Sequence, residues 1–313
     1  MRLISPAAEP VVAARRSPAR FAWLRALGLA VGLAIAGCGG RSPAAPEPAP
    51  LVQRPQVLLI SVDGLRGDAA AGAAPNIAAL AARGSYTWQA ETVLPSVTLT
   101  SHASMLSGYT PARHGVVWND DDPGKGTIGV PTVFTLARAA GLRTAMIAGK
   151  SKFAHLNQPG ALSTFVIAPG GDRDVAERAA AEVAAGTDLV FAHLPDTDMC
   201  GHRWRWMSRD YMATVARADQ FVGLLLAAAG PGTTVIVTAD HGGSGNTHGT
   251  ADPAHLRIPW VMAGPGVRQG ALGSRVRTFD TAATVARVLG LSPAGMDGTP
   301  VAEAFLSVAP RGH

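Results

Sequence analysis

Three separate segments of this chain carry carboxylate and imidazole side chains at short spacings. The segments are "VLLISVDG" (57–64), "PDTDMCGHRW" (195–204) and "TADHGGSGNTHG" (238–249), and the residues are Asp63, Asp198, His202, Asp240, His241 and His248. Carboxylate oxygens and imidazole nitrogens are the ligands that Zn²⁺ and similar divalent ions take in proteins. The residue types therefore predict a metal centre that is assembled from distant parts of the chain.

The six residues divide into two ligand sets. Asp63, Asp240 and His241, with one further oxygen, predict a first metal site. Asp198, His202 and His248 predict a second site, with Gly201 letting the chain turn tightly and one position open for water or substrate. Two divalent ions about 4 Å apart clamp the attacking and the leaving oxygen of a phosphoryl displacement. The sequence thus favours two divalent metal ions, with Zn²⁺ as the expected ion, and phosphoryl chemistry.

A hydroxyl-rich segment, "VLPSVTLTSHASMLSGYTPARHGVVWND" (93–120), offers a nucleophile for that chemistry. A Thr hydroxyl is a poor nucleophile unless a metal or a base lowers its pKa. Thr98 stands where an apolar helix pattern begins, so free backbone N–H groups and the positive end of the helix dipole would lie near an incoming phosphate. Asn119 can donate a neutral hydrogen bond to a phosphoryl oxygen. The competing hydroxyls belong to Ser96, Thr100 and Ser101.

Apolar runs alternate with helical patterns from residue 57 onward. Runs typical of buried strands lie at 57–64, 143–149, 188–194, 233–242 and 258–267. Helical patterns lie at 75–84, 132–141, 172–186, 209–230 and 279–290. This alternation predicts an α/β fold, a three-layer α/β/α domain with a mostly parallel central sheet. Ligands bind outside the carboxyl ends of the strands in such sheets, where Asp63, Asp198 and Asp240 are expected.

The first 56 residues predict export. The apolar run "ALGLAVGLAIAG" (26–37) follows several arginines, is too short to span a membrane and is typical of a secretory signal. Small residues directly before Cys38 resemble the lipobox of bacterial lipoproteins, so residues 1–37 are the predicted signal peptide and Cys38 the predicted lipidation site. A plain signal peptide or an uncleaved anchor is the alternative. Residues 38–56 predict a Pro/Ala-rich tether, and 57–313 one catalytic domain.

Composition and charge narrow the expected partners. The net charge is +5, but no Lys/Arg cluster with interleaved aromatic residues occurs, so nucleic-acid binding is not indicated. Of the two cysteines, Cys38 is the predicted lipid site, which leaves Cys200 without a disulfide partner. The expected partners are a small phosphate ester, diester or pyrophosphate and a membrane reached through the lipid anchor. The expected location is the periplasm, at the bacterial outer membrane.

Taken together, the motifs resemble the alkaline phosphatase superfamily, and within it the type I phosphodiesterase/nucleotide pyrophosphatase branch. The matching stretches are "VLLISVDG", "PSVTLTSHASMLSGYTPARHG", "DMCGH", "DHGG", "IPWVMAGPGV" and "MDGTP", which cover nearly all of the predicted domain. The resemblance implies an alkaline phosphatase-like fold and Thr98 as a nucleophile that is transiently phosphorylated. The implied zinc ligands are Asp63, Thr98, Asp240 and His241 in one site and Asp198, His202 and His248 in the other. Asn119 and the Thr98 backbone N–H are implied to bind a non-bridging oxygen.

One departure from this branch concerns the last histidine ligand. Members of the branch usually carry a long insertion between the Asp-His-Gly motif and that histidine, whereas "DHGGSGNTHG" brings His248 close behind His241. His255 in "DPAHLRIPW" is the alternative ligand, and His248 is preferred because its glycine neighbours permit close approach. The cap insertion is therefore expected to be small or absent, and the substrate specificity of the branch does not carry over.

Two lysines, Lys150 and Lys152, lie in "AGKSKFAHL" (148–156) after a predicted strand. The segment resembles the paired lysines with which phosphonoacetate hydrolase, a relative that cleaves carbon–phosphorus bonds, holds the carboxylate of its substrate. Both lysines are therefore candidate substrate-binding residues, and C–P hydrolysis is an alternative function. Transfer of a phospho-alcohol headgroup is a further alternative, because such transferases share the metal pair and the nucleophile.

Other enzyme and binding classes fit less well. A sulfatase needs a C/S-x-P-x-R context for its formylglycine, and neither cysteine of this chain lies in one. A serine hydrolase needs a G-x-S-x-G elbow after a strand, and "GGSGN" does not supply that elbow. A solute-binding lipoprotein has no need for so many metal-ligand residues. Asn119 is a neutral donor where an arginine would better suit a dianionic monoester. The expected activity is therefore hydrolysis of phosphodiesters or pyrophosphates.

Overall fold

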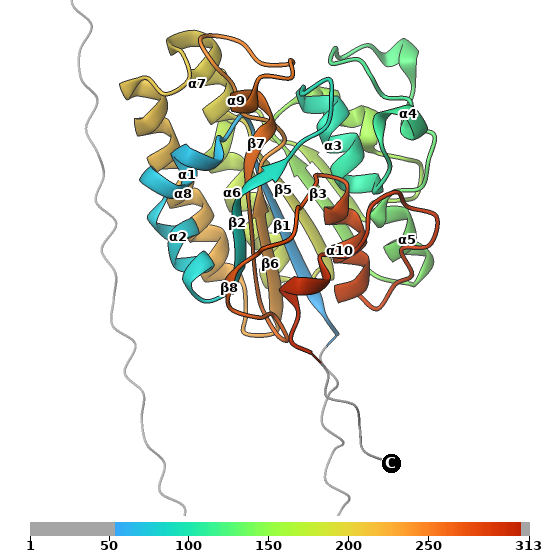
Figure 1. Cartoon of the computed structure of the whole chain (residues 1–313). Coiled ribbons are helices and arrows are strands. Elements are labelled where there is room, and N and C mark those ends of the chain that lie inside the picture. The colour runs from blue at the N-terminus through green and yellow to red at the C-terminus, as the bar shows by residue number, and fades with distance from the viewer. Residues whose placement is uncertain (1–53, 308–313) are drawn as a thin grey trace, which may run out of the picture. The chain divides into compact units, whose positions relative to one another are not determined.

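Eight strands form one sheet in the computed structural model of the chain, which describes residues 54–307 (Figure 1). The strands are β1 (Gln56–Val62), β2 (Ser85–Glu91), β3 (Thr144–Ala148), β4 (Thr164–Ile167), β5 (Leu189–Leu194), β6 (Thr233–Thr238), β7 (Arg257–Ala263) and β8 (Gly270–Ala271). Their order across the sheet is β4-β3-β5-β1-β6-β7-β2-β8. Only β7 runs antiparallel to its neighbours β6 and β2 among these pairs. The mostly parallel sheet confirms the predicted fold class.

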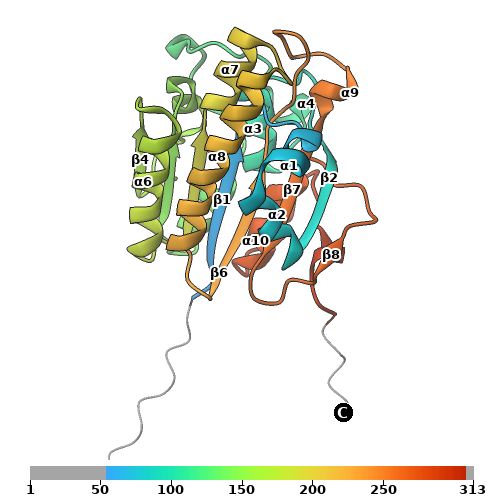
Figure 2. The ribbon, with the colours of Figure 1, turned by 90° about the vertical axis from the view of Figure 1, so that its left-hand side faces the viewer.

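Helices cover both faces of the sheet (Figures 1 and 2). One layer contains α1 (Gly67–Ala73), α2 (Pro75–Ala82), α6 (Gly171–Ala184) and α8 (Arg209–Ala228), and the opposite layer contains α3 (Thr98–Ser107), α5 (Val133–Ala139) and α10 (Asp280–Val288). The shorter helices are α4 (Pro111–His114), α7 (Asp196–Trp204) and α9 (Pro253–Leu256), with 3-10 turns η1 (Pro123–Lys125), η2 (Ser151–Leu156) and η3 (Ala302–Ala304). The domain therefore has the three layers that the alternating pattern predicts.

The strand β1 lies in the middle of the sheet and pairs in parallel with β5 and β6. Its residues from Val57 to Val62 are all buried, as expected for an apolar run that is covered on both faces. In the register of the sheet, Ser61 of β1 lies opposite His193 of β5 and Thr238 of β6. The carboxyl ends of these three strands therefore meet at one edge, and the segments that follow them are brought together there.

The helix α3 begins at Thr98, as the apolar pattern predicts. Its N-cap residue, Val97, has an extended backbone and no side chain that can cap the helix. The first N–H groups of the helix must therefore find partners elsewhere. All ten residues of α3 are buried, including the hydroxyl residues at its start. A helix start of this kind leaves donors open inside the protein rather than at its surface.

The helix α7 differs from the tight turn that Gly201 was expected to make. Asp198 and His202 lie one helical turn apart on α7, so their side chains share a face. Gly201 has a different reason to lack a side chain, because a Cβ at this position would lie 2.5 Å from Cε2 of Trp206. The expectation of a turn is wrong, and the spacing of the two ligands comes from helix geometry.

The predicted signal peptide (1–37), the lipidation site Cys38 and nearly all of the tether lie outside the described residues. β1 begins at Gln56, the last residue of the predicted tether. Among residues 54–307, no helix combines the length and the apolar character needed to cross a membrane.

Candidate metal centre

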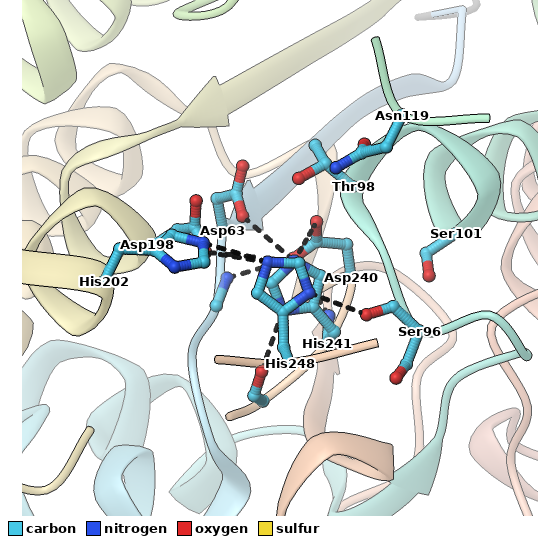
Figure 3. A network of polar contacts seen from close by, with 12 residues as sticks. Asp63, Ser96, Thr98, Ser101, Asn119, Asp198, His202, Asp240, His241 and His248 are labelled. Carbon is cyan, nitrogen blue, oxygen red and sulfur yellow. Dashed lines mark hydrogen bonds and ion pairs between the residues drawn. The ribbon is translucent and has the colours of Figure 1, made fainter. Parts of the chain in front are cut away.

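The six predicted metal ligands meet at the carboxyl edge of the sheet (Figure 3). They are Asp63 after β1, Asp198 and His202 on α7 after β5, and Asp240, His241 and His248 after β6. The segments touch directly, because a Cβ added to Gly64 would lie 2.9 Å from the Cα of Asp198. The segment after β1 and the helix α7 therefore pack backbone against backbone.

Asp63, Asp240 and His241 form the first cluster, called group A here. The Nε2 atom of His241 lies 3.5 Å from Oδ1 of Asp63 and 3.3 Å from Oδ2 of Asp240. The other oxygen of Asp240, Oδ1, accepts the backbone N–H groups of Gly64 at 3.0 Å and of His241 at 2.9 Å. All three side chains are completely buried. Asp240 is therefore fixed by one oxygen while the other faces its neighbours in group A.

Asp198, His202 and His248 form the second cluster, called group B. Oδ1 of Asp198 lies 3.4 Å from Nε2 of His202 and 3.6 Å from Nε2 of His248, and the two nitrogens are 3.0 Å apart. The same oxygen is 4.0 Å from Nε2 of His241 in group A. Asp63, Asp198 and His241 also lie close enough to hold a common ion, so Asp198 adjoins both groups. Three ligand atoms of group B converge on one point.

The three histidines of the two groups share one orientation. Each places Nδ1 against a backbone carbonyl oxygen: His202 against Asn246 at 2.9 Å, His241 against Gly242 at 2.8 Å and His248 against Ser96 at 2.9 Å. A carbonyl can only accept, so Nδ1 carries a proton in each ring, and in the neutral form of the imidazole Nε2 is the electron-pair donor. Backbone contacts of this kind fix the tautomer that a metal-binding histidine needs.

The buried ligand atoms lack hydrogen-bond partners. Within the described part of the chain, Oδ1 of Asp63, Oδ1 of Asp198, Oδ2 of Asp240 and Nε2 of His241 are buried without one. A buried polar atom without a partner is costly, and a concentration of such atoms calls for an explanation. A divalent cation coordinated by these oxygens and nitrogens supplies it, so the donor set fits Zn²⁺ or a similar ion.

The pKa of each buried carboxyl group in the two clusters depends on the charged groups beside it. Burial alone would raise the pKa of Asp63, but the Lys150 ammonium and a hydrogen bond from His193 hold it well below its usual range. Burial, reinforced by repulsion from Asp63, raises the pKa of Asp240 well above its usual range. Burial and the neighbouring His241 lower the pKa of His248 to about 4, so this imidazole is neutral at pH 7. A hydrogen bond with Asp198 raises the pKa of His202. Clustered carboxylates beside a neutral imidazole form an environment that favours a divalent cation.

The Lys150 ammonium lies between group A and group B. Its nitrogen is 2.6 Å from Oδ2 of Asp63 and 2.6 Å from Oδ2 of Asp198. Both contacts use the oxygens that do not belong to the unpartnered set, so the ligand atoms stay free. Lys152 donates a hydrogen bond of 2.5 Å to the backbone carbonyl of Asn119. The two predicted substrate-binding lysines thus contact the ligand carboxylates and the Asn119 loop.

Thr98 and Asn119 lie side by side next to the predicted metal ligands (Figure 3). Oδ1 of Asn119 accepts the backbone N–H of Leu99 at 3.0 Å, which leaves the side-chain NH₂ group free to donate to another atom. Two competing hydroxyls are engaged elsewhere, since Ser96 donates to the Thr250 carbonyl oxygen and Ser101 bonds to Thr92. The structure therefore places the predicted nucleophile and the predicted donor together.

The alternative ligand His255 lies outside both groups. Its Nε2 shares a hydrogen bond of 2.9 Å with the hydroxyl of Ser244, and its Nδ1 one of 2.8 Å with the hydroxyl of Thr250. Both ring nitrogens are therefore used within the loop that leads to α9. His248, not His255, contributes to group B.

Two buried histidines that the sequence analysis did not single out support the ligands. His193 in β5 lies 2.8 Å from Oδ2 of Asp63 through its Nε2. His102 in α3 bonds to the Thr98 carbonyl oxygen through Nδ1 and to the Ser61 hydroxyl through Nε2, both at 2.8 Å. The sequence does place each histidine inside an apolar strand or helix pattern, and a buried imidazole needs a hydrogen-bond partner. That signal indicates a partner but does not identify it.

Asp172, at the start of α6, is a buried carboxyl group near the ligand edge. It is 1% exposed, and its Oδ1 accepts the backbone N–H of Asp196 at 3.0 Å. Burial, together with repulsion from Asp196, raises its pKa from 3.8 to about 8. In the folded protein this group therefore keeps its proton at pH 7, whereas the unfolded chain loses it.

We expect Asp172→Asn to increase stability at neutral pH. Between the unfolded pKa of 3.8 and the folded pKa of about 8, the folded state binds one more proton than the unfolded state. The free energy of unfolding of the wild type therefore falls as pH rises through this window, by about 1.4 kcal/mol per pH unit. Asparagine keeps the acceptor oxygen and does not titrate. Urea unfolding at pH 5 and pH 7.5 measures the difference, which should grow with pH; a constant difference would contradict the raised pKa.

Comparison with known proteins identifies relatives of the whole domain and of parts of it. The family model of type I phosphodiesterase / nucleotide pyrophosphatase matches residues 57–257. The chain is 42% identical over 127 residues to the phosphopentomutase of Methylobacterium sp. (strain 4-46), covering 39% of this chain and 30% of that protein. It is 37% identical over 135 residues to the phosphopentomutase of Methylobacterium nodulans, covering 41% and 32%. The matches thus span less than a third of the length of these curated relatives.

Solved structures share the fold at low sequence identity. Murine ectonucleotide pyrophosphatase / phosphodiesterase 5, in an inactive form in complex with AMP, superposes with a TM-score of 0.71 at 14% identity, covering 80% of this chain and 100% of that chain. A 2-O GAG sulfatase superposes with a TM-score of 0.69 at 18% identity, covering 80% and 74%. At such identities the likeness concerns the fold alone, which is that of the alkaline phosphatase superfamily.

Proposed function

Because the chain belongs to the type I phosphodiesterase / nucleotide pyrophosphatase family, we propose that it hydrolyses phosphodiesters or pyrophosphates at a two-metal site, with Thr98 as the nucleophile. The observation that carries this proposal is the convergence of four buried, unpartnered ligand atoms beside the start of α3. Group A and Thr98 would bind one divalent ion, and group B the other, most simply as Zn²⁺. Such ions lower the pKa of a hydroxyl or a water and stabilise the charge of the transferring phosphoryl group.

The residues of the chain supply the nucleophile and its position. The Thr98 hydroxyl oxygen would attack phosphorus and form a P–O bond, while the bond from phosphorus to the leaving oxygen breaks. The Thr98 hydroxyl proton passes to solvent water, and the departing alcohol or phosphate takes up a proton from solvent water. Water then cleaves the phosphothreonine, which restores the hydroxyl and releases the phosphoryl product. Thr98 is buried at the start of α3, so the backbone that carries the hydroxyl is held by the packing of the helix.

Asn119 would hold a non-bridging oxygen of the substrate. Its side-chain carbonyl is fixed by the Leu99 N–H, so the NH₂ group is the only part left to donate. The backbone N–H groups at the start of α3 add donors and the positive end of the helix dipole. These donors are neutral, which favours a singly charged phosphodiester over a dianionic monoester. The same preference includes pyrophosphate linkages.

A comparison of two chromogenic substrates tests this preference. Bis-p-nitrophenyl phosphate should be hydrolysed with a higher kcat/KM than p-nitrophenyl phosphate by the purified chain supplied with zinc. The expected ratio is about tenfold or more, equal to a difference of at least 1.4 kcal/mol in transition-state binding. A reversed ratio would overturn the diester assignment while leaving the metal centre intact.

Phosphoryl transfer between two sites of a sugar is the second candidate, because the curated relatives are phosphopentomutases. A mutase would return the phosphoryl group of Thr98 to another hydroxyl instead of to water. Headgroup transfer between lipids would use a second alcohol in the same way. Release of free product from nucleotides, glycerophosphodiesters and pentose phosphates, followed by phosphorus NMR, separates hydrolysis from both transfers.

Cleavage of a carbon–phosphorus bond is a further alternative that the lysine pair supports. To contact a substrate carboxylate, Lys150 and Lys152 would have to exchange their contacts with Asp63, Asp198 and the Asn119 carbonyl oxygen. Phosphonoacetate in the same substrate screen tests this role directly.

A further inference from the structure

Two tryptophans that stand two residues apart have opposite environments. Trp204, the last residue of α7, is 51% exposed, whereas Trp206 is 5% exposed. Arg205 and Met207, on either side of Trp206, are the non-glycine residues with positive φ in the described part of the chain, at 77° and 63°. Side chains rarely adopt this conformation, so the backbone is held in it by its surroundings. Between these two residues of positive φ, the Trp206 ring points into the protein.

The Trp206 ring lies between two glycines that belong to the ligand segments. A Cβ at Gly201, next to His202, would lie 2.5 Å from Cε2 of the indole, and a Cβ at Gly243 would overlap the same atom. Only glycine leaves room for the ring at both positions. The indole therefore fills the space between α7, which carries two ligands of group B, and the loop that carries the third.

Hydrogen bonds tie Trp206 to the same segments. Its indole N–H donates to the Gly64 carbonyl oxygen at 2.9 Å, directly after Asp63, and its backbone N–H donates to the Gly245 carbonyl oxygen at 2.8 Å. One residue thus contacts the backbone that follows β1 and the loop that precedes His248. These two bonds hold the indole in place between α7 and the loop that carries His248.

The ring also packs against the imidazoles of group B. The ring centroids of Trp206 and His202 are 5.1 Å apart at 83°, and those of Trp206 and His248 are 5.8 Å apart at 70°. Both arrangements are the edge-to-face geometry that aromatic rings prefer. The backbone contacts at Nδ1 hold each imidazole at one atom, and the indole restricts rotation of its ring. Together they aim the Nε2 atoms of His202 and His248 at the same point.

We propose that Trp206 is a positioning residue for the second metal site, which holds His202 and His248 in their ligand orientation without itself contacting the ion. This inference rests on the proposed function, because it assumes that group B binds a divalent ion. It predicts that Trp206 controls the affinity of group B more than that of group A, whose side chains do not pack on the indole.

The test measures zinc stoichiometry and affinity of the full chain after chelation, dialysis and titration with Zn²⁺. The wild type should bind two ions, and Trp206→Leu should bind the second ion about 10–100-fold more weakly, as expected when a group that orients ligands is lost. Trp206→Phe keeps a ring but loses the bond to Gly64, so its loss should be smaller. Trp204→Leu is the matched control and should bind two ions as the wild type does.

A double variant separates positioning from a general structural role. His202→Ala should leave group A as the remaining site, because His202 belongs to the group B set alone, and adding Trp206→Leu to it should not weaken that site further. Loss of zinc from group A in the double variant overturns the inference, as does wild-type affinity for both ions in Trp206→Leu. If Trp206→Leu does not fold by circular dichroism, Trp206→Phe decides: unchanged affinity for the second ion overturns the inference. A wild-type chain that binds no zinc contradicts the proposed function itself.

Discussion

Thr98→Ala should lower the turnover of bis-p-nitrophenyl phosphate by at least about 10⁴-fold while the chain keeps its metal ions. The hydroxyl is the group that forms the new bond to phosphorus in the proposed mechanism. Ser96 and Ser101 are bonded to Thr250 and Thr92, so neither is available. The measurement combines kcat/KM with metal analysis of the same preparation.

The control for this variant lies two residues further along the same helix. Thr100 is also completely buried, and its hydroxyl has no hydrogen-bond partner among the described residues. Residues two apart on a helix do not share a face, so Thr100→Ala should retain turnover close to that of the wild type. Thr98→Ser, which keeps a hydroxyl, should retain a measurable part. Mass spectrometry of a quenched reaction should find a phosphorylated peptide that contains Thr98. Full activity of Thr98→Ala would remove Thr98 from the mechanism.

Removal of divalent ions should have the second large effect. A chelator is expected to reduce turnover by at least about 10³-fold, because each metal contributes several kcal/mol to the transition state and 1.4 kcal/mol is a factor of ten. Zn²⁺ added in excess should restore the activity. Ion binding should also stabilise the fold, by about 2.7 kcal/mol when free zinc is 100 times the Kd.

The physical reason for this expectation is the set of unpartnered atoms in groups A and B. Without an ion, the buried carboxylates of Asp63 and Asp198 are balanced chiefly by Lys150, and Asp240 has one oxygen without a partner. Calorimetric titration should give two equivalents of zinc per chain, with Mg²⁺ as the comparison ion. Turnover that persists at the wild-type rate after the bound metal has been removed would exclude a metal mechanism.

The clustering of the candidate ligand residues could be predicted because their chemistry and their positions agree. A continuous apolar run such as Val57–Val62 indicates a central strand, and the polar residue that follows it must lie at the sheet edge. Parallel topology then brings Asp63 and Asp240 together without knowledge of any distance. The preference for His248 over His255 also followed from the sequence, because glycines around His248 allow a close approach.

Other parts of the fold left weaker signals. β2 is only partly buried and carries an irregularity in its pairing with β7 between Thr87 and Ala90, so it shows no clean apolar run. The helix α7 has a glycine in its interior, which sequence reasoning assigns to a turn. Position 201 needs a glycine because the Trp206 ring occupies the space that a side chain would fill. No local sequence pattern predicts this contact. Likewise, a lysine after a strand indicates a charge at the edge but not its bridge between Asp63 and Asp198.

The hydrogen bond from the Gly64 N–H to Oδ1 of Asp240 joins residues that are 176 positions apart. β1 is made early in translation, yet its two neighbours in the sheet, β5 and β6, come from the second half of the chain. A growing polypeptide on the ribosome therefore has no group A until His241 has emerged, and group B is completed only with His248. If the groups bind metal ions, this binding must follow synthesis of most of the domain, and a prematurely terminated product would lack both sites.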